Sequence, residues 1–498
     1  MGFTTQTFLF VFFPLCILLY SAVTALERCG KIGVFLCRLR LKDITAILLS
    51  LAFYAWACFD DVFWLIFYIL IVYLAARIIE GARMQKSFLG LYRETETGDA
   101  VMHKRVYAAV FPFIISVAAV VLCLVIYKYT GFFLQVFTGS SDTKNPIAPL
   151  GLSFITFSAI SYLADIYRGK ASCGSLIDCA LYLTFFPKVV SGPIVLWKNF
   201  QPQIKERRTS LEMISRGLDR IMIGFAKKVI IADTLGACLA EINIYAADRV
   251  TAAGTLLLYM MQIYYDFAGY SDIAIGLACL FGFKFDNNFD FPYRSQSISE
   301  FWRRWHISLG SWFREYIYFP LGGSRAGLKR TLFNLGVVFL LTGIWHGAGW
   351  NYILWGVING IAVIVERLIQ KKQFYIKTPD IVKWLCTMTV VICLWQLFRY
   401  ENISDAAHVF SVIFGFEKAE TVHFTWQYYF NARIILFVLA GVIGSTLLGS
   451  PRVKAIYDRV AETKAGFIIQ EIVLLTLFAL SILFMVNSTY SPFLYFRY

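Results

Sequence analysis

Long apolar segments recur along the whole chain and are separated by short polar stretches. About 20 apolar residues in a helix are enough to cross the hydrocarbon core of a bilayer. Segments of this kind predict roughly ten to thirteen spanning helices, and the clear ones are 8–26, 44–59, 62–74, 106–127, 147–163, 256–283, 331–345, 352–365, 384–397, 434–448 and 467–486. Two weaker segments, 181–197 and 214–235, contain charged residues and indicate short, tilted or buried helices.

The pattern within these segments predicts helices rather than strands. A membrane β-barrel alternates apolar and polar residues along each strand, and these segments do not alternate. The chain also lacks an internal repeat and a low-complexity segment. We therefore expect an all-α polytopic membrane protein that forms a single membrane domain over residues 1–498.

Composition excludes several other classes of protein. Hydrophobic residues make up 58% of the chain and charged residues 16%, against about 45–50% and about 25% in soluble domains. A chain this apolar is not a soluble multi-domain enzyme, a disordered protein or a nucleic-acid-binding protein. The 11 cysteines include no C-x-x-C pair and no Cys/His cluster, so no metal site is predicted.

The basic residues predict the orientation of the chain, because cytoplasmic loops are rich in Lys and Arg. The net charge of +14 agrees with such loops. Segment 8–26 has no preceding Lys or Arg, unlike a secretory signal, and is long enough to span, so we expect a retained first helix. The basic residues that follow it predict a cytoplasmic loop and an outside N-terminus; they are Arg28, Lys31, Arg38, Arg40 and Lys42. A basic stretch also precedes the last apolar segment and places Tyr498 outside; its residues are Arg452, Lys454, Arg459 and Lys464.

Two carboxylates lie inside an apolar stretch, where charge is costly. Asp266 and Asp272 occur in MQIYYDFAGYSDIAIG. We expect each to form a buried ion pair between helices. The second interpretation is that they line a cavity and bind substrate or donor.

An amphipathic aromatic segment follows, with the sequence SISEFWRRWHISLGSWFREYIYFPLGG. Its apolar positions recur at helical spacing, but Arg303 and Arg304 interrupt them. We expect a helix that is interfacial or re-entrant rather than spanning, with His306 in its middle. The two arginines either bind donor phosphates at the cytoplasmic mouth or extend to lipid headgroups.

His346 is the ionisable residue of an otherwise uncharged apolar run, LTGIWHGAGWNYILWGVING. Burial disfavours the charged imidazolium, so a neutral imidazole there could accept a proton. A lone core histidine is the ordinary interpretation of such a residue. The aromatic and small neighbours, and a second histidine 40 positions earlier, favour catalysis.

These strings resemble the membrane-bound O-acyltransferase family, and more specifically its bacterial branch of alginate O-acetyltransferase membrane proteins. The resemblance rests on FFPKVVSGPI (185–194), QIYYDFAGYSDIAIG (262–276), FDFPYRSQSISEFWRRWHISLGSWFREYIYFPLGG (289–323) and LTGIWHGAGWNYILWG (341–356). It implies a ring of helices around a central tunnel, with re-entrant or interfacial helices and a catalytic core at about 145–370. His346 matches the catalytic histidine of the family, and His306 matches its second active-site position, expected to orient the substrate or stabilise an oxyanion.

The resemblance also implies a substrate, a donor and a partner. We expect an O-acyltransferase of the bacterial cytoplasmic membrane that acetylates a cell-envelope polysaccharide of the alginate, cellulose or peptidoglycan type. Acetyl-CoA is the expected acyl donor, without a bound cofactor. An extracytoplasmic partner of the SGNH, or serine-esterase-like, type is expected to receive the acyl group.

Two alternatives remain open from the sequence. The first is D-alanyl transfer to teichoic acids from an acyl carrier protein, which shares the fold. The second is a transporter or channel in which Asp266, Asp272 and the arginines mark a solute path. The histidine pair favours acyl transfer over transport.

The aromatic tail SPFLYFRY, residues 491–498, has two interpretations. Aromatic residues at a membrane edge usually form an interfacial belt. The alternative is an acyl relay, because a phenol can accept an acyl group once a base removes its proton. In that alternative, which the resemblance to envelope-acylating relatives suggests, Tyr498 carries the acyl group to the partner.

Overall fold

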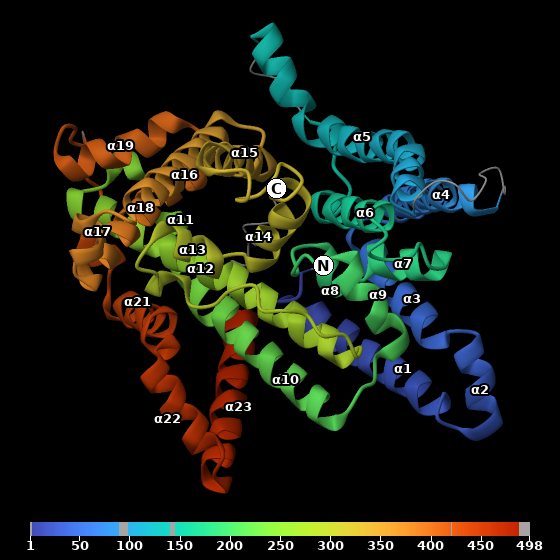
Figure 1. The fold of residues 1–498 in the computed structure, drawn as a ribbon. Helices are drawn as coiled ribbons and strands as arrows, with labels where there is room; N and C mark the ends of the chain where they lie inside the picture. Colours follow the sequence, from blue (N-terminus) through green and yellow to red (C-terminus); the bar gives the residue numbers. More distant parts are fainter. Residues whose placement is uncertain (1, 89–97, 140–144, 420, 488–498) are drawn as a thin grey trace. The chain divides into compact units, whose positions relative to one another are not determined.

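The computed structural model describes residues 2–88, 98–139, 145–419 and 421–487, and all regular structure within these residues is helical (Figure 1). Eight helices of the described residues are long and apolar enough to cross a membrane. They are Phe8–Leu26, Asp60–Met84, Ala108–Thr138, Leu328–His346, Trp350–Ile369, Asp380–Arg399, Ala432–Gly449 and Lys464–Asn487. The chain is an all-α polytopic membrane protein, as the sequence predicted.

The eight long apolar helices found in the described residues compare with the ten to thirteen spanning helices predicted. Helices α3 (Leu41–Ala57) and α6 (Leu152–Tyr167) have 17 and 16 residues, which is short of the about 20 needed to span. Helix α12 (Arg249–Leu280) is long enough but carries Asp266 and Asp272, and it is not among the eight. The ring of helices around a tunnel stays a prediction.

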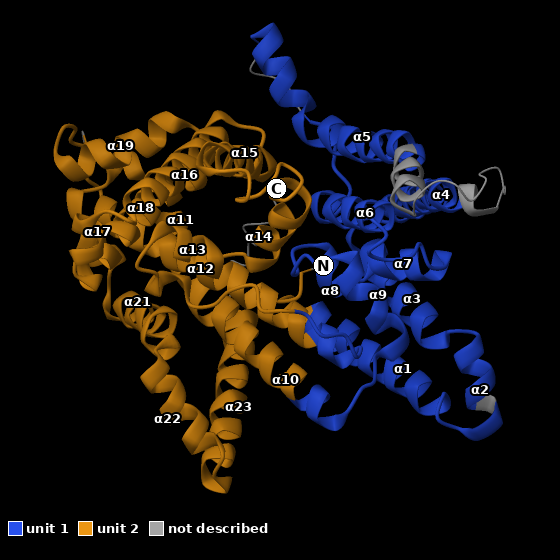
Figure 2. Cartoon of the chain, viewed as in Figure 1, with its two compact units in different colours: residues 1, 7–215, 277–285 blue, residues 2–6, 216–276, 286–498 orange. Residues whose placement is uncertain are grey.

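The described chain forms two compact units (Figure 2). Unit 1 comprises residues 1, 7–215 and 277–285, and unit 2 comprises residues 2–6, 216–276 and 286–498. Because the two units are defined by their internal packing, they do not test the expectation of a single membrane domain with its core at about 145–370.

Unit 1 contains the first nine α-helices and the start of the tenth. A π-helical turn at Phe8–Phe12 precedes α1. The helices are α1 (Phe13–Leu26), α2 (Gly30–Arg38), α3, α4 (Asp60–Phe88), α5 (Gly98–Thr138), α6, α7 (Leu176–Thr184), α8 (Phe186–Val189), α9 (Trp197–Glu206) and α10 (Leu211–Phe225).

The FFPKVVSGPI string (185–194) follows directly after α7 and forms the short helix α8 and the turn after it. A Cβ on Gly192 would lie 2.1 Å from the Pro187 carbonyl oxygen, so this turn closes only with glycine. Lys188 is buried, and its amine donates a hydrogen bond to Ser158 Oγ at 2.7 Å. The string is therefore part of the interior of unit 1.

Unit 2 contains the remaining helices and both candidate catalytic histidines. Five short elements lie among its described residues: the π-helical segments η2 (Ala226–Ala232) and η5 (Arg314–Tyr318), and the 3-10 turns η3 (Ile244–Ala246), η4 (Pro292–Arg294) and η6 (Leu447–Gly449). Besides the rest of α10 and most of α12, the unit contains α11 (Asp233–Glu241), α13 (Ile298–Arg304), α14 (Ile307–Phe313), α15 (Leu328–His346), α16 (Trp350–Ile369), α17 (Gln373–Lys377), α18 (Asp380–Arg399), α19 (Ile403–Phe414), α20 (Trp426–Tyr429), α21 (Ala432–Ser445), α22 (Pro451–Ala461) and α23 (Lys464–Asn487).

Glycines bring the backbone of α10 against that of α12. A Cβ on Gly224 would lie 2.6 Å from the Gly269 carbonyl oxygen, and one on Gly276 would lie 2.5 Å from the Gly217 carbonyl oxygen. Gly217 and Gly224 are seven residues apart on α10, and Gly269 and Gly276 are seven residues apart on α12. Seven residues make about two helical turns, so the contact repeats along one face of each helix. This close approach places the basic residues that follow Gly217 beside the aspartates of α12.

Candidate active site

The helix is interrupted at His306, so this segment forms two short helices instead of one. Helix α13 ends at Arg304 and α14 begins at Ile307. His306 between them has φ 45° and ψ 54°, a left-handed conformation that is uncommon for a residue other than glycine. The expectation of a single helix with His306 in its middle was therefore wrong. The break turns the His306 side chain into the interior, where it is 3% exposed.

Asn288, which lies 18 residues before His306 in the sequence, stabilises the turn between α13 and α14. Its backbone carbonyl accepts the Ile307 N–H at 2.9 Å. Its side-chain Oδ1 accepts the backbone N–H and the hydroxyl of Ser308, at 3.2 and 2.9 Å. Its Nδ2 donates to Ser271 Oγ on α12 at 3.0 Å. Asn288 is 1% exposed, so these bonds satisfy a buried amide that would otherwise destabilise the fold.

The same bonds fix the tautomer of His306. The Ser308 backbone N–H can only donate, so the atom of Asn288 that faces it must be the oxygen. His306 Nδ1 lies 3.1 Å from this oxygen and therefore carries the ring proton. Nε2 is left with a lone pair, and it is buried without a hydrogen-bond partner among the described residues. Burial lowers the pKa of His306 from 6.5 to about 3, so the ring is neutral near pH 7.

His346 is the last residue of α15 and is 4% exposed. Helices α15 and α16 lie side by side (Figure 1) because glycines meet at their contact. A Cβ on Gly343 would lie 2.5 Å from the Tyr352 carbonyl oxygen, and one on Gly356 would lie 2.9 Å from the Gly343 Cα. This close packing fixes the end of α15 and with it the imidazole.

Aromatic rings surround His346. The ring centroids of Trp345, Trp355 and Phe398 lie 4.7, 5.1 and 4.9 Å from that of His346. The Trp355 and Phe398 rings are turned edge-on to it, at interplanar angles of 88° and 79°. The imidazole is therefore held in largely aromatic, apolar surroundings.

Trp345 links the two histidines. Its ring centroid lies 6.4 Å from that of His306, in addition to its contact with His346. Phe267 of α12 also contacts His306, edge-on at a centroid distance of 4.7 Å. Both histidines thus belong to one aromatic cluster of unit 2. Their position at a tunnel bottleneck and their catalytic roles stay predictions.

Asp266 and Asp272 both form ion pairs, as the first interpretation of the sequence requires. Asp266 Oδ1 lies 2.8 Å from Lys228 Nζ, which also contacts Asp233 at 2.5 Å. Asp272 contacts Arg220 at 2.7 Å and Lys227 at 2.6 Å, so two cations compensate its charge. Binding of substrate or donor by the two aspartates stays a prediction.

The two arginines of α13 differ in their surroundings. Arg304 contacts Glu300 at 2.9 Å and Asp290 at 3.0 Å, so its charge is compensated within the chain. Arg303 is exposed and has no ion pair among the described residues. Of the two, Arg303 is therefore the one available to a phosphate group. Tyr498 and the tail 491–498 lie outside the described residues.

Sequence reasoning missed Asn288 and Lys228. Asn288 occurs in a loop string, FDNNFDFPYR, in which no periodicity marks one polar residue above another. In the sequence, Lys228 is only one of several charged residues in the weak apolar segment 214–235. The two aspartates of α12 were the available signal for it, because a buried carboxylate requires a cationic partner.

The fold and the cluster together define a class: a polytopic membrane protein with two buried histidines in one aromatic cluster. The chain matches the family model of the membrane-bound O-acyltransferases over residues 166–404, a range that includes both histidines. A probable alginate O-acetylase of Pseudomonas putida is 33% identical over 527 aligned residues, which cover 100% of both chains. The chain belongs to the membrane-bound O-acyltransferase family and is an O-acyltransferase.

Two further relatives carry different names. A peptidoglycan O-acetyltransferase of Helicobacter pylori is 31% identical, and the alignment covers 84% of this chain and 81% of the relative. A teichoic acid D-alanyltransferase of Streptococcus thermophilus is 29% identical over 47% of this chain and 60% of the relative. Family membership favours the enzymatic interpretation over the transporter alternative.

Proposed function

We propose that this enzyme transfers an acetyl group from acetyl-CoA on the cytoplasmic side and thereby O-acetylates a cell-envelope polysaccharide outside the bacterial cytoplasmic membrane. The observation that carries the proposal is the similarity over nearly the whole chain to relatives named alginate O-acetylase and peptidoglycan O-acetyltransferase. The polymer is accordingly of the alginate, cellulose or peptidoglycan type. Both termini face outside in this proposal, as the basic segments predict.

His346 is the general base of the proposed reaction. Its neutral imidazole removes the proton of the attacking hydroxyl as the oxygen bonds to the thioester carbonyl carbon. The carbon–sulfur bond then breaks, and the proton passes from His346 to the departing thiolate. The aromatic rings around His346 support this role because they exclude the water that would hydrolyse the thioester.

His306 orients the reactants. An unprotonated Nε2 accepts hydrogen bonds, so it suits a hydroxyl or amide N–H of a reactant. It does not suit an oxyanion, which needs a donor. Of the two roles expected from the sequence, orientation therefore fits the hydrogen bonds of His306. On the donor side, Arg303 is the guanidinium proposed to bind donor phosphates.

An extracytoplasmic partner of the SGNH type completes the proposed transfer. Its serine receives the acetyl group from the membrane enzyme and passes it to a hydroxyl of the polymer. This step rests on the resemblance of the chain to envelope-acylating relatives. D-alanyl transfer is the less supported candidate, because the D-alanyltransferase relative matches only 47% of this chain.

Deletion of the gene tests the proposal. We expect ester-linked acetyl groups on the envelope polysaccharide to fall to background in the deletion strain and to return with the wild-type gene. The measurement is mass spectrometry of polymer fragments before and after mild alkali, which removes esters. Unchanged acetylation, or loss of D-alanyl esters instead, would contradict the assignment.

Tyr498→Phe tests the proposed relay. In the relay the phenol oxygen of Tyr498 attacks the thioester, His346 takes its proton, and the resulting phenyl ester passes the acetyl group to the serine of the partner. We expect polymer acetylation to fall to background in Tyr498→Phe, which removes only the hydroxyl. Tyr495→Phe is the matched control in the same tail and should acetylate normally. Wild-type acetylation in Tyr498→Phe would leave the tail as an interfacial belt.

A further inference from the structure

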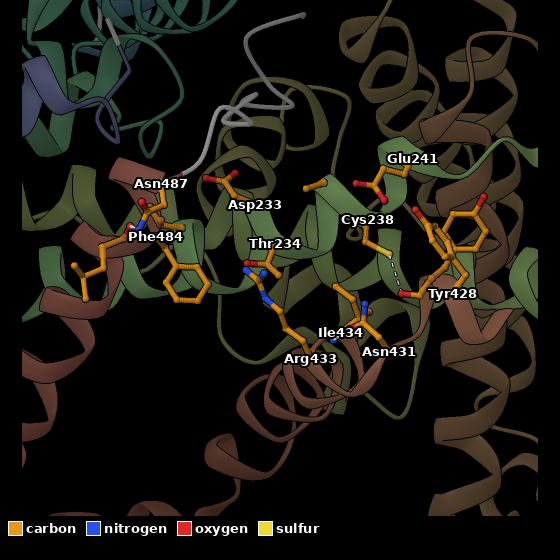
Figure 3. Close-up of a pocket in the computed structure, with 14 residues that line it drawn as sticks. Asp233, Thr234, Cys238, Glu241, Tyr428, Asn431, Arg433, Ile434, Phe484 and Asn487 are labelled. Carbon is orange, nitrogen blue, oxygen red and sulfur yellow. Dashed lines mark hydrogen bonds between the residues drawn. The ribbon is translucent and has the colours of Figure 1, made fainter. Parts of the chain in front are cut away.

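A cavity of about 680 Å³ lies in unit 2, and none of its lining residues belongs to the aromatic cluster of the two histidines (Figure 3). It is lined by one face of η2 and α11, by α20 and the start of α21, and by the end of α23. Its volume falls within the range of about 300–1,000 Å³ of small-molecule sites. Charged side chains of both signs line it, namely Asp233, Glu241 and Arg433. The cavity therefore suits a ligand that carries charge.

The cavity lies where two spanning helices have their ends. Ala432–Gly449 and Lys464–Asn487 are both long and apolar enough to cross a membrane. The first begins beside the cavity, which Arg433 lines, and the second ends in it, at Asn487. Because about 20 residues cross the hydrocarbon core, the ends of spanning helices lie at the level of the lipid headgroups. A ligand in the cavity is therefore at headgroup depth.

The side chains around the cavity agree with this depth. Leu436 and Leu439 on α21 and Leu483 on α23 are exposed, and apolar side chains exposed on a spanning helix contact lipid chains. Trp426 and Tyr428, just before α21, are exposed aromatic residues of the kind that gather at a membrane–water interface. Lipid is thus the neighbour of this cavity.

Arg433 supplies the positive charge of the site. Its guanidinium lies 5.6 Å from the ring centroid of Phe484 and 6.0 Å from that of Phe437. Among the described residues it has neither an ion pair nor a hydrogen bond. Figure 3 shows the guanidinium turned toward Thr234 on α11. A guanidinium held against aromatic faces still presents its N–H groups, and these match the geometry of a phosphate.

Glu241 supplies a negative charge two helical turns from Thr234. The seven residues from one to the other correspond to about 10 Å of helix, and both line the cavity. Glu241 is exposed and has neither a hydrogen bond nor an ion pair within the described part of the chain. Asp233, by contrast, is engaged by Lys228 at 2.5 Å. Glu241 is therefore the carboxylate available to a cationic group.

The two charges together define the chemistry of the ligand. A guanidinium and a carboxylate about 10 Å apart along α11 can be bridged by a group that carries both a phosphate and an ammonium, with a hydrogen bond of about 2.8 Å at each end. A phospholipid headgroup of the ethanolamine type carries these two charges, joined by a two-carbon link. Its acyl chains would then lie along the exposed leucines of α21 and α23.

We propose that this cavity binds a phospholipid whose headgroup carries a primary ammonium group, with Arg433 pairing the phosphate and Glu241 the ammonium. Such a lipid bridges α21 to α11 and thereby stabilises the folded protein. The inference goes beyond the proposed function and does not depend on which polymer the enzyme acylates.

Native mass spectrometry of lipid binding tests the proposal. The full chain, purified in detergent and stripped of lipid, is titrated with dioleoyl phosphatidylethanolamine and with dioleoyl phosphatidylglycerol. We expect one saturable site that binds the ethanolamine lipid about tenfold more tightly, because the glycerol headgroup lacks the charged hydrogen bond to Glu241. The ethanolamine lipid should also raise the melting temperature more than the glycerol lipid does.

Variants of the two charged residues separate their roles. Arg433→Gln should weaken the binding of both lipids about tenfold, since both contain a phosphate. Glu241→Gln should weaken only the ethanolamine lipid, to the affinity of the glycerol lipid. Arg452→Gln and Glu462→Gln are the matched controls. Both residues are exposed, lie at the other end of the α21–α23 hairpin and should leave binding unchanged.

Several results would overturn the inference. They are equal affinity of the wild type for the two lipids, or wild-type affinity for the ethanolamine lipid in Arg433→Gln or Glu241→Gln. Glycerophosphoethanolamine, the soluble headgroup without acyl chains, should compete only weakly, and binding as tight as that of the lipid would assign the cavity to a soluble phosphate ester instead. His346→Ala should bind the lipid like the wild type, so a failure of acyl transfer does not affect this test.

Discussion

His346→Ala should reduce polymer acetylation by about 10²–10⁴-fold, the usual contribution of a general base, while the protein still folds and inserts. Its imidazole is 4% exposed and lies among Trp345, Trp355 and Phe398. Water in the space left by the ring cannot be positioned as the imidazole is, so it should not restore proton transfer. The measurement is the acetyl-ester content of the polymer, normalised to the amount of enzyme in the membrane.

His408→Ala is the matched control for this variant. His408 is also in unit 2, but it pairs with Glu417 at 2.6 Å and stacks on Tyr245, outside the aromatic cluster of His346. We expect it to acetylate at the wild-type level. Normal acetylation by His346→Ala, or an equal loss in both variants, would contradict the assignment of His346.

His306→Asn should lower the transfer rate by about 10–100-fold, less than the loss expected for His346. Leaving a buried donor without its partner costs about 1–3 kcal/mol, and each 1.4 kcal/mol corresponds to about tenfold in rate. Asparagine is the suitable replacement because it tolerates the left-handed backbone of this position, φ 45°, better than alanine does. The measurement is kcat/KM for transfer from labelled acetyl-CoA.

Asn288 variants test the tautomer on which the role of His306 depends. Asn288→Asp keeps an oxygen that accepts from His306 Nδ1 and from Ser308, whereas Asn288→Leu removes it. We expect Asn288→Asp to retain most activity and Asn288→Leu to lose as much as His306→Asn. A double variant His306→Asn/Asn288→Leu should lose no more than His306→Asn alone. Additive losses would show that Asn288 acts independently of His306.

Helix type and membrane character could be predicted from the sequence because both depend on local pattern. Apolar runs long enough to span, with charge between them, predicted α15, α16, α18, α21 and α23. His346 stood out for the same reason, as an ionisable residue within such a run. The short lengths of α3 and α6 were less visible, because boundaries depend on turns such as the one at Gly151, where φ is 69°.

The break at His306 depends on contacts that no local pattern carries. The aromatic spacing from Phe301 to Tyr316 fits a continuous helix, and local propensity agrees with it. The bonds from Asn288 to Ile307 and Ser308 outweigh that propensity by satisfying a buried amide. The ion pairs of Lys228 likewise depend on the contact of α10 and η2 with α12. The aspartates of α12 signal that a cation is needed, and the glycines at 217, 224, 269 and 276 allow the helices to approach.

Transfer of labelled acetyl by purified enzyme tests the central claim most directly. Wild-type protein and His346→Ala are reconstituted in vesicles with labelled acetyl-CoA on one side and the acceptor polysaccharide with the esterase-like partner on the other. We predict labelled ester on the polymer with the wild type and background with His346→Ala. Equal label on the polymer with the two proteins, or none with the wild type, would contradict acetyl transfer through His346.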